Sequence, residues 1–351
     1  MNLTLKWYLE GVDNGSLVPD DVIDAYINKA STSDTYNAFV RTHPNYVSTH
    51  METFAERALA GAPIAVKDNF LTKWYITSCA SHMLQDYMSP YSSTAFVRLE
   101  SAGWLMIGKS NMDEFAMWWS NETSYYGPVK NPHNPTKVAW WSSGWSAAAV
   151  AGDLCLWALG TDTGGSVRLP AALCGVVGIK PTYGRVSRYG IQSMSSSLDQ
   201  AGVITKTVDD GILLLDSISG HDDRDATSQD RTGIYGDQSQ RKELLKKDID
   251  LAGKKFALPK QYLSEGLDDS IREIFLNIVQ KLTDAGATVD EIDLPLLEYG
   301  IMTYYIICPA EVSTNMARFD GIRFGLQGET QDHESIQQYY QHIRAKWFGD
   351  E

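Results

Sequence analysis

The chain has 351 residues, of which 43% are hydrophobic and 21% are charged, and this balance is typical of a folded globular protein. Its 44 acidic residues outnumber its 30 basic ones, which gives a formal net charge of −14. Because such a surface repels phosphate backbones, the composition argues against direct binding of nucleic acid over most of the surface. Any nucleic acid would have to be held by a partner.

The cysteines are widely spaced and form no Cys-x-x-Cys pair, which argues against a zinc site and against a disulfide framework. We interpret them as buried thiols in a reducing compartment; they are Cys79, Cys155, Cys174 and Cys308. Charged and polar residues come too early in the chain for a signal peptide, and no run of about 18 apolar residues occurs. We therefore predict a cytoplasmic protein with no membrane segment.

Apolar residues at helical spacing predict a helical entry segment over about residues 1–60. Apolar runs at 62–67 and 105–107 predict short buried strands, with a helix over about 94–101 between them. This strand-helix-strand order indicates a largely parallel sheet. Further along, a short helix is expected at 146–151, followed by a core strand at 154–159 that leads into a glycine-rich loop.

The second half of the chain predicts another strand-helix-strand unit, with strands at 255–258 and 289–292 and a helix over 268–286. The polar stretch at 217–250 is interpreted as a surface excursion rather than a domain boundary. We predict one α/β domain over residues 1–351. Because the chain ends in charged sequence directly after a helical pattern, we expect the C-terminal part of this domain to be missing.

The glycine-rich loop places Ser166 where successive backbone amides can point at one developing oxyanion. Thr163, Gly164 and Gly165 offer these amides. The loop lacks the Gly-Lys-Ser/Thr of a P-loop, which argues against a phosphate cradle. The alternative is that the segment is only a turn after a strand.

A nucleophilic serine needs a base, and no histidine lies in the serine segment or beside a Gly-x-Ser-x-Gly elbow. Lys67 ends an apolar strand, where burial would lower the pKa of its amine and leave it able to accept a proton. The alternative is a strand-end lysine that reaches solvent.

Three segments together resemble the amidase signature family: Lys67-Asp-Asn69, Ser142-Ser-Gly144 and Thr161-Asp-Thr-Gly-Gly-Ser-Val-Arg168. The resemblance implies a lysine, a serine with a cis peptide bond and a nucleophilic serine, which correspond to Lys67, Ser142 and Ser166. These lie 75 residues (142 − 67) and 24 residues (166 − 142) apart, the spacing expected in that family. The resemblance also implies the amidase signature fold, an α/β fold in which helices cover both faces of a mixed central β-sheet.

Within this family the chain is similar to the A subunits of glutamyl-tRNA(Gln) and aspartyl-tRNA(Asn) amidotransferases. The similar segments are Asn111–Met117, Lys180–Gly190, Ser197–Gln200, Gly220–Asp225 and Ala317–Arg323. This similarity implies that Ser166 attacks the side-chain amide of glutamine and that Ser142 relays its proton to neutral Lys67. Tyr304 or Tyr305 would contact the glutamine.

The same similarity implies a heterotrimer in which this chain supplies ammonia. A B subunit would hold the tRNA and use ATP and Mg, and a small C subunit would brace the pair. No metal or cofactor is expected on this chain. Members of the family continue past this chain's last residue with groups that bind the substrate's carboxylate and amine, so we expect weak or no glutaminase activity from the chain alone.

The ten tryptophans all fall where the family pattern has, or readily accepts, glycine, and none is expected to act as an ordinary core aromatic. They are Trp7, Trp74, Trp104, Trp118, Trp119, Trp140, Trp141, Trp145, Trp157 and Trp347. Our hypothesis is that UGA codons meaning glycine were translated as tryptophan, which the codons in the gene would test. Two alternatives stay open: a stand-alone amidase of another carboxamide, and a catalytically impaired scaffold subunit if the tryptophans are genuine.

Overall fold

The computed structural model describes residues 3–32, 34–55, 59–229, 250–263, 265–328 and 335–350. The chain divides into two compact units, one formed by Met1–Thr232 with Cys308–Glu351 and the other by Gly233–Ile307. The first boundary falls inside the polar stretch 217–250, where the sequence predicted a surface excursion of a single domain. Polar sequence of this kind buries little apolar surface, which suits a connection between two units.

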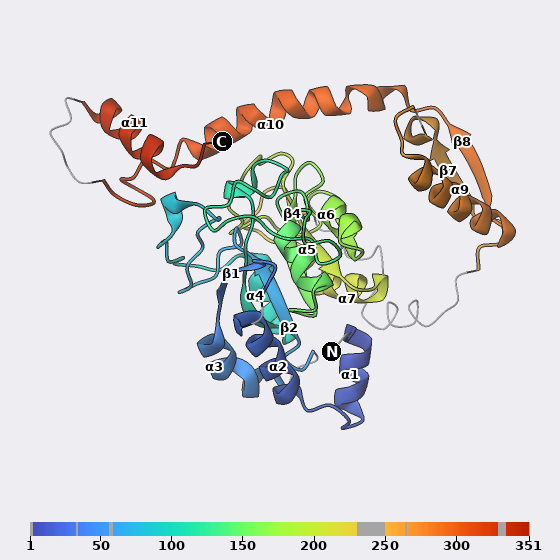
Figure 1. Cartoon of the computed structure of the whole chain (residues 1–351), viewed down its shortest axis with the longest axis horizontal. Helices are drawn as coiled ribbons and strands as arrows, with labels where there is room; N and C mark the ends of the chain where they lie inside the picture. Colours follow the sequence, from blue (N-terminus) through green and yellow to red (C-terminus); the bar gives the residue numbers. More distant parts are fainter. Residues whose placement is uncertain are drawn as a thin grey trace. The chain divides into compact units, whose positions relative to one another are not determined.

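The first unit is built on a six-stranded sheet in the order β1-β3-β2-β4-β6-β5. Figure 1 labels β1, β2 and β4 of this sheet. Strands β3 and β4 run parallel to β2, whereas the other three neighbouring pairs are antiparallel. The mixed sheet implied by the family resemblance is therefore confirmed. The largely parallel sheet that the strand-helix-strand order indicated is wrong, because only β2, β3 and β4 of this sheet pair in parallel. The strands are β1 (Phe39–Thr42), β2 (Pro63–Lys67), β3 (Leu105–Ser110), β4 (Trp157–Asp162), β5 (Val177–Ile179) and β6 (Gln200–Thr205).

The sheet centre is the core of this unit, because every residue of β2, β3, β4 and β6 is buried. The predictions of strands at 62–67 and 105–107 are confirmed. The strand predicted at 154–159 begins only at Trp157, because residues 154–156 form a bend before it. Strands β5 and β6 were not predicted, since their short segments are held by pairing to each other and to β4.

Helices flank this sheet: α5 packs on β2 and β4, α3 packs on β3, and α7 packs on β6. Alanine fills much of α5, and small side chains let it lie close to the strands that carry the site. The helices of this unit are α1 (Leu5–Asp13), α2 (Pro19–Thr32), α3 (Pro44–Ala55), α4 (Thr94–Ala102), α5 (Gly144–Ala151), α6 (Arg168–Leu173), α7 (Val208–Ile218), the last part of α10 (Gly300–Met316) and α11 (Ile336–Trp347), with 3₁₀ turns η1 (His82–Leu84) and η2 (Glu114–Ala116).

The N-terminal segment predicted to be helical contains α1, α2 and α3 but also the edge strand β1. Four residues are too few for alternation to be distinguished from helical spacing. Strand β1 forms through its antiparallel pairing with β3, whose register shifts between Phe39 and Arg41. The edge strand is therefore decided by a tertiary contact.

The second unit confirms the predicted strand-helix-strand order, because β7 and β8 pair in parallel and α9 lies between them in the chain. Asp268 caps α9 by accepting hydrogen bonds from the amides of Ser270 and Ile271, as an N-cap residue does. Its elements are β7 (Lys255–Pro259), η3 (Lys260–Leu263), α9 (Asp269–Asp284), β8 (Thr288–Ile292), η4 (Pro295–Tyr299) and the first part of α10 (Gly300–Met316).

All four cysteines lie within the described residues, where they are buried as predicted and no disulfide joins them. Among the described residues, no helix is both long enough and apolar enough to cross a membrane.

Candidate active site

Lys67 lies at the end of β2, and none of its surface is exposed. Its Nζ lies 2.8 Å from Ser142 Oγ, 2.9 Å from Ser143 Oγ and 3.0 Å from Thr161 Oγ1. Burial lowers the pKa of Lys67 from 10.5 to about 7, and nearby carboxylates oppose this shift only in part. The lysine is therefore a buried amine that is available as a base near neutral pH, not a residue that reaches solvent.

The hydrogen bonds around Lys67 distinguish the two adjacent serines. Ser143 Oγ donates to the carbonyl of Thr161 at 3.1 Å, so it accepts from Lys67. Thr161 Oγ1 accepts from Asn69 Nδ2 at 3.0 Å and likewise accepts from Lys67. A neutral amine has two hydrogens and one lone pair, and both hydrogens are then engaged. The amine also lies 2.8 Å from Ser142 Oγ, and the role of Ser142 in passing a proton to Lys67 stays a prediction.

The backbone before Ser142 differs from the expectation. Among the described residues no peptide bond is cis, so the cis bond implied at Ser142 is absent. The chain instead enters α5 through two consecutive residues in the left-handed region, Trp140 with φ 67° and Trp141 with φ 59°. The turn is thus made by rotation about φ at these two positions.

Ser166 lies in the turn between β4 and α6, only 3% exposed, and Asp162 organises this turn. One carboxylate oxygen of Asp162 accepts the Gly165 amide at 2.9 Å, and the other accepts the Val167 amide at 3.1 Å. The Arg168 guanidinium adds two hydrogen bonds of 2.9 Å to the same carboxylate. Paired, charge-assisted bonds of this kind tie the loop firmly to the end of β4.

The three amides predicted to hold an oxyanion are not equivalent. The amide of Gly165 already donates to Asp162. In the part of the chain that the structure describes, the amides of Thr163 and Gly164 make no hydrogen bond, and these two are the better candidates. The Ser166 hydroxyl likewise makes no hydrogen bond to a described residue, Ser142 included, so its role as nucleophile stays a prediction.

Sequence reasoning missed the groups that orient the site. Ser143, Thr161 and Asn69 surround Lys67, and each lies inside a segment already singled out, beside a residue that was chosen. Asp162 was readable from the sequence, because a carboxylate before a glycine-rich turn is a common acceptor for loop amides. Asp199, which accepts the Thr163 hydroxyl at 2.6 Å, comes from a distant loop and carries no local signal.

Residues 21–351 match the amidase family. The chain belongs to the amidase family. It is 45% identical over 334 residues to the glutamyl-tRNA(Gln) amidotransferase A subunit of Salinibacter ruber, covering 92% of this chain and 63% of the relative. The corresponding A subunit of Halothermothrix orenii is 43% identical, covering 95% and 68% of the two chains. The chain therefore spans about two thirds of these relatives.

Solved structures agree with this assignment. The crystal structure of the glutamyl-tRNA(Gln) amidotransferase A subunit from Thermotoga maritima matches with a TM-score of 0.79 and 35% identity, covering 98% of this chain and 70% of that one. A peptide amidase in complex with chymostatin matches with a TM-score of 0.79 and 25% identity, covering 90% and 67%. The predicted amidase fold is thereby confirmed.

Four tryptophans occupy the left-handed region of backbone space: Trp74 at φ 66°, Trp118 at φ 73°, and the pair Trp140 and Trp141. For residues other than glycine this region costs about 1–2 kcal/mol, and bulky side chains rarely adopt it. Glycine has no such penalty. At these four positions the backbone therefore favours glycine, as the family pattern predicts.

Three other tryptophans behave differently from the expectation that none is a core aromatic. Trp104, Trp145 and Trp157 are among the largest fully buried side chains, and the rings of Trp104 and Trp157 pack edge to face with centroids 4.6 Å apart. The expectation is wrong for these three, because space beside the strands accommodates their indoles. The indole nitrogens of Trp104 and Trp145 are nevertheless buried without a partner among the described residues, which is costly for an N–H group.

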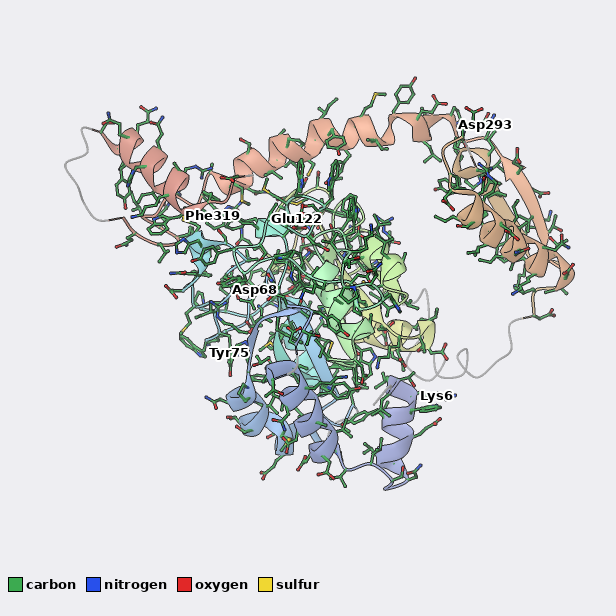
Figure 2. The ribbon with its side chains drawn as sticks, in the orientation of Figure 1. Lys6, Asp68, Tyr75, Glu122, Asp293 and Phe319 are labelled. Atoms are coloured by element: carbon green, nitrogen blue, oxygen red, sulfur yellow. The ribbon has the colours of Figure 1, made fainter. Side chains whose placement is uncertain are left out.

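The predicted substrate contacts Tyr304 and Tyr305 lie on α10, in the second unit, with ring centroids 5.6 Å apart. The triad lies in the first unit, and each unit is described by itself. Contact of either tyrosine with glutamine therefore stays a prediction. Figure 2 labels Asp68, next to Lys67 in the first unit, and Asp293 in the second.

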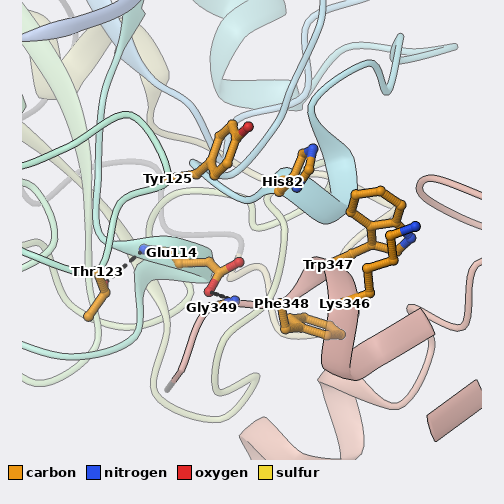
Figure 3. A pocket seen from close by; sticks show the side chains of 8 residues that line it. All are labelled: His82, Glu114, Thr123, Tyr125, Lys346, Trp347, Phe348 and Gly349. Carbon is orange, nitrogen blue, oxygen red and sulfur yellow. Dashed lines mark hydrogen bonds between the residues drawn. The ribbon is translucent and has the colours of Figure 1, made fainter. Parts of the chain in front are cut away.

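A separate cavity of about 200 Å³ lies in the first unit and contains none of the predicted catalytic residues (Figure 3). Its wall includes His82, Tyr125 and the segment 346–349. Glu114 in this wall accepts the Gly349 amide at 2.9 Å, and burial raises the pKa of its carboxyl. The hydrogen bond shows that Glu114 is used to hold the segment 346–349 in place.

Proposed function

We propose that this chain is the glutamine-hydrolysing subunit of a tRNA-dependent amidotransferase, the enzyme that converts Glu-tRNA(Gln) to Gln-tRNA(Gln). The observation that carries the proposal is the 2.8 Å contact between Lys67 Nζ and Ser142 Oγ, made by a buried amine whose pKa is about 7. The relatives from Salinibacter, Halothermothrix and Thermotoga, each named as the A subunit of such an enzyme, support this activity over that of a free amidase.

The proposed reaction begins with attack of Ser166 Oγ on the amide carbon of glutamine. As this bond forms, the Ser166 proton moves to Ser142 Oγ, and the Ser142 proton moves to the lone pair of Lys67. The proton then returns from Lys67 through Ser142 to the leaving nitrogen, and the carbon–nitrogen bond breaks to release ammonia. Water hydrolyses the remaining ester to glutamate and regenerates Ser166.

The oxyanion formed in this attack needs donors that are already in place. The amides of Thr163 and Gly164 have this role in our proposal, because no described residue accepts their hydrogen bonds. Asp162 supports them by holding the Gly165 amide, which fixes the next peptide of the loop. Preorganised amides stabilise the transition state because they need no reorientation as charge develops.

The proposed complex gives this chain no nucleic-acid or nucleotide site of its own. A B subunit would hold the tRNA and use ATP with Mg to activate the glutamyl group, and a C subunit would brace the pair in the cytoplasm. The net charge of −14 on this chain is consistent with tRNA being held elsewhere. Tyr304 or Tyr305 would contact the glutamine side chain.

Two other functions are separated from this one by experiment. A stand-alone amidase would release ammonia from carboxamides such as acetamide or benzamide without partners. A scaffold subunit would assemble with its partners but would behave identically with Ser166→Ala. The positive φ at Trp140 and Trp141, directly before Ser142, is the observation that favours an impaired site in this polypeptide.

The test measures ammonia release from glutamine and from acetamide, for the 351-residue chain with and without B and C subunits. The proposal expects glutamine to be preferred, the partners to raise the rate, and Ser166→Ala and Lys67→Ala to abolish it. A rate that is unchanged by Ser166→Ala would contradict the proposed role of Ser166. Preference for acetamide without any effect of the partners would support the stand-alone amidase.

A further inference from the structure

The carboxylate of Asp199 holds the loop at 194–199 together and also binds the loop that carries Thr163 and Ser166. Asp199 accepts the amides of Met194 and Ser195 at 2.9 Å and 3.1 Å. The same carboxylate accepts the hydroxyl of Thr163 at 2.6 Å. Asp199 is 5% exposed, and buried charge-assisted bonds of this kind are strong and directional. The position of Thr163 therefore depends on the position of this loop.

The other side of the loop is held by the last part of α10, within the same unit. Glu311 accepts the hydroxyl of Ser195 at 2.6 Å, and it accepts the amide and the hydroxyl of Ser197 at 3.0 Å and 2.6 Å. Asn315 donates to the carbonyl of Met194 at 3.0 Å. Residues four apart lie on one helix face, so Glu311 and Asn315 form hydrogen bonds to the loop from the same side of α10.

We propose that Glu311 is a positioning residue for amide hydrolysis, acting on the oxyanion-binding loop through Ser195, Asp199 and Thr163. This inference rests on the proposed function, because that function supplies the reaction. The hydrogen bonds of the network are observed independently of it. Thr163 carries one of the two candidate oxyanion amides, and Asp199 holds this residue through its side-chain hydroxyl. Loosening the 194–199 loop allows that amide to leave its position, which lowers the rate of attack by Ser166.

The test compares Glu311→Ala with Thr314→Ala in the full 351-residue chain. Thr314 is exposed on the same helix, and its hydroxyl donates to the carbonyl of Ala310 within that helix, so it controls for damage to α10. The readout is the rate at which an alkyl fluorophosphonate labels Ser166, forming a phosphorus–oxygen bond with loss of fluoride. Removing an oxyanion donor outright costs about 10²–10³-fold, so displacing one indirectly should cost about ten-fold.

A double-mutant cycle separates this role from a general effect on stability. Thr163→Val removes the hydroxyl that Asp199 holds and keeps the side chain's shape. If Glu311 acts through Thr163, Glu311→Ala should slow labelling about ten-fold in the parent but less than two-fold in the Thr163→Val background. Equal effects in both backgrounds would overturn the inference, and Glu311→Gln should recover part of the rate.

If the fluorophosphonate does not react with Ser166 in the parent chain, hydrogen–deuterium exchange over residues 160–168 provides a second readout. Glu311→Ala should speed exchange in this segment at least several-fold, while Thr314→Ala should leave it unchanged. No change with Glu311→Ala would overturn the inference. The chain could also release no ammonia from glutamine even with its partners, while its labelling or exchange still depends on Glu311. That result would contradict the proposed function but not the role of Glu311.

Discussion

The indole ring of Trp141 lies against Gly165: its Cζ2 is 3.9 Å from the point that a β-carbon on Gly165 would occupy. Gly165 immediately precedes Ser166 and has φ 133°, a conformation that favours glycine. The indole therefore fills space beside the proposed nucleophile. Its nitrogen is buried and has no hydrogen-bond partner among the described residues, so nothing polar compensates for its position.

Replacing Trp141 should open the site. We expect Trp141→Gly to raise the rate of Ser166 labelling by a fluorophosphonate about ten-fold, because it removes the ring that lies beside Gly165 and gives the reagent access to Ser166. Trp141→Ala is the matched control, since it removes the indole but keeps a β-carbon at φ 59°. Both variants should label faster than the parent, and Trp141→Gly should also unfold at a higher urea concentration than Trp141→Ala. Slower labelling in both would contradict the blocking role of the ring.

The same substitution should have opposite effects on stability at two exposed tryptophans. Trp74 is 65% exposed with φ 66°, whereas Trp7 is 64% exposed inside α1. Trp74→Gly relieves about 1–2 kcal/mol of backbone strain against roughly 0.5–1 kcal/mol of added chain entropy, so the free energy of unfolding should rise. Trp7→Gly should lower it by about 0.5–1 kcal/mol, since glycine is a poor helix former.

Urea unfolding of the two variants, followed beside the parent, measures this difference. If both variants changed the free energy of unfolding in the same direction, the backbone conformation at Trp74 would not determine how this residue affects stability. Reading the ten tryptophan codons in the gene tests the recoding hypothesis separately, because a UGG codon at any position excludes it there.

The rate at which the fluorophosphonate labels Ser166 should depend on pH, because Lys67 must be neutral to act as the base. The burial that lowers the pKa of Lys67 to about 7 makes the protonated amine the main form below pH 7 and the neutral base the main form above it. The labelling rate should therefore rise with pH, with a midpoint near 7, and level off above about pH 8. Lys67→Met should lower the plateau by about 10²–10⁴-fold and remove this step. A rate that falls as pH rises through 7 would rule out Lys67 as the base.

Substitution of the adjacent serines Ser142 and Ser143 should affect the labelling rate and the thermal stability differently. Ser142→Ala removes the proton relay and should reduce the labelling rate by about 10²-fold or more. Ser143→Ala removes one acceptor for Lys67 and should reduce it about three- to ten-fold, the value of a single hydrogen bond. Because Ser143 Oγ also bonds the backbone of Thr161, Ser143→Ala should lower the thermal midpoint more than Ser142→Ala. Equal losses of rate in the two variants would count against a separate relay.

The family and the candidate catalytic residues could be predicted from the sequence because they lie in short contiguous segments. Lys67 ends a wholly apolar strand, and Ser142 and Ser166 lie in glycine- and serine-rich turns, so each is marked by its immediate neighbours. The strand-helix-strand order of the second unit was likewise visible, since Asp268 and Gly286 mark the ends of α9. The edge strand β1 was not visible, because four residues leave no periodicity to measure.

Local sequence determined which residues can carry the chemistry, and the tertiary structure decided which of them meet and in what orientation. The different hydrogen bonds of Ser142 and Ser143 come from Thr161, 94 residues after Lys67, because the Thr161 carbonyl accepts from Ser143 Oγ and the Thr161 hydroxyl accepts from the Lys67 amine. Asp199 reaches Thr163 for the same kind of reason, across strands β4 and β6 that pair antiparallel. Residue types set the available donors and acceptors, whereas burial lowers the pKa of Lys67 and the order of the strands decides which side chains its amine meets.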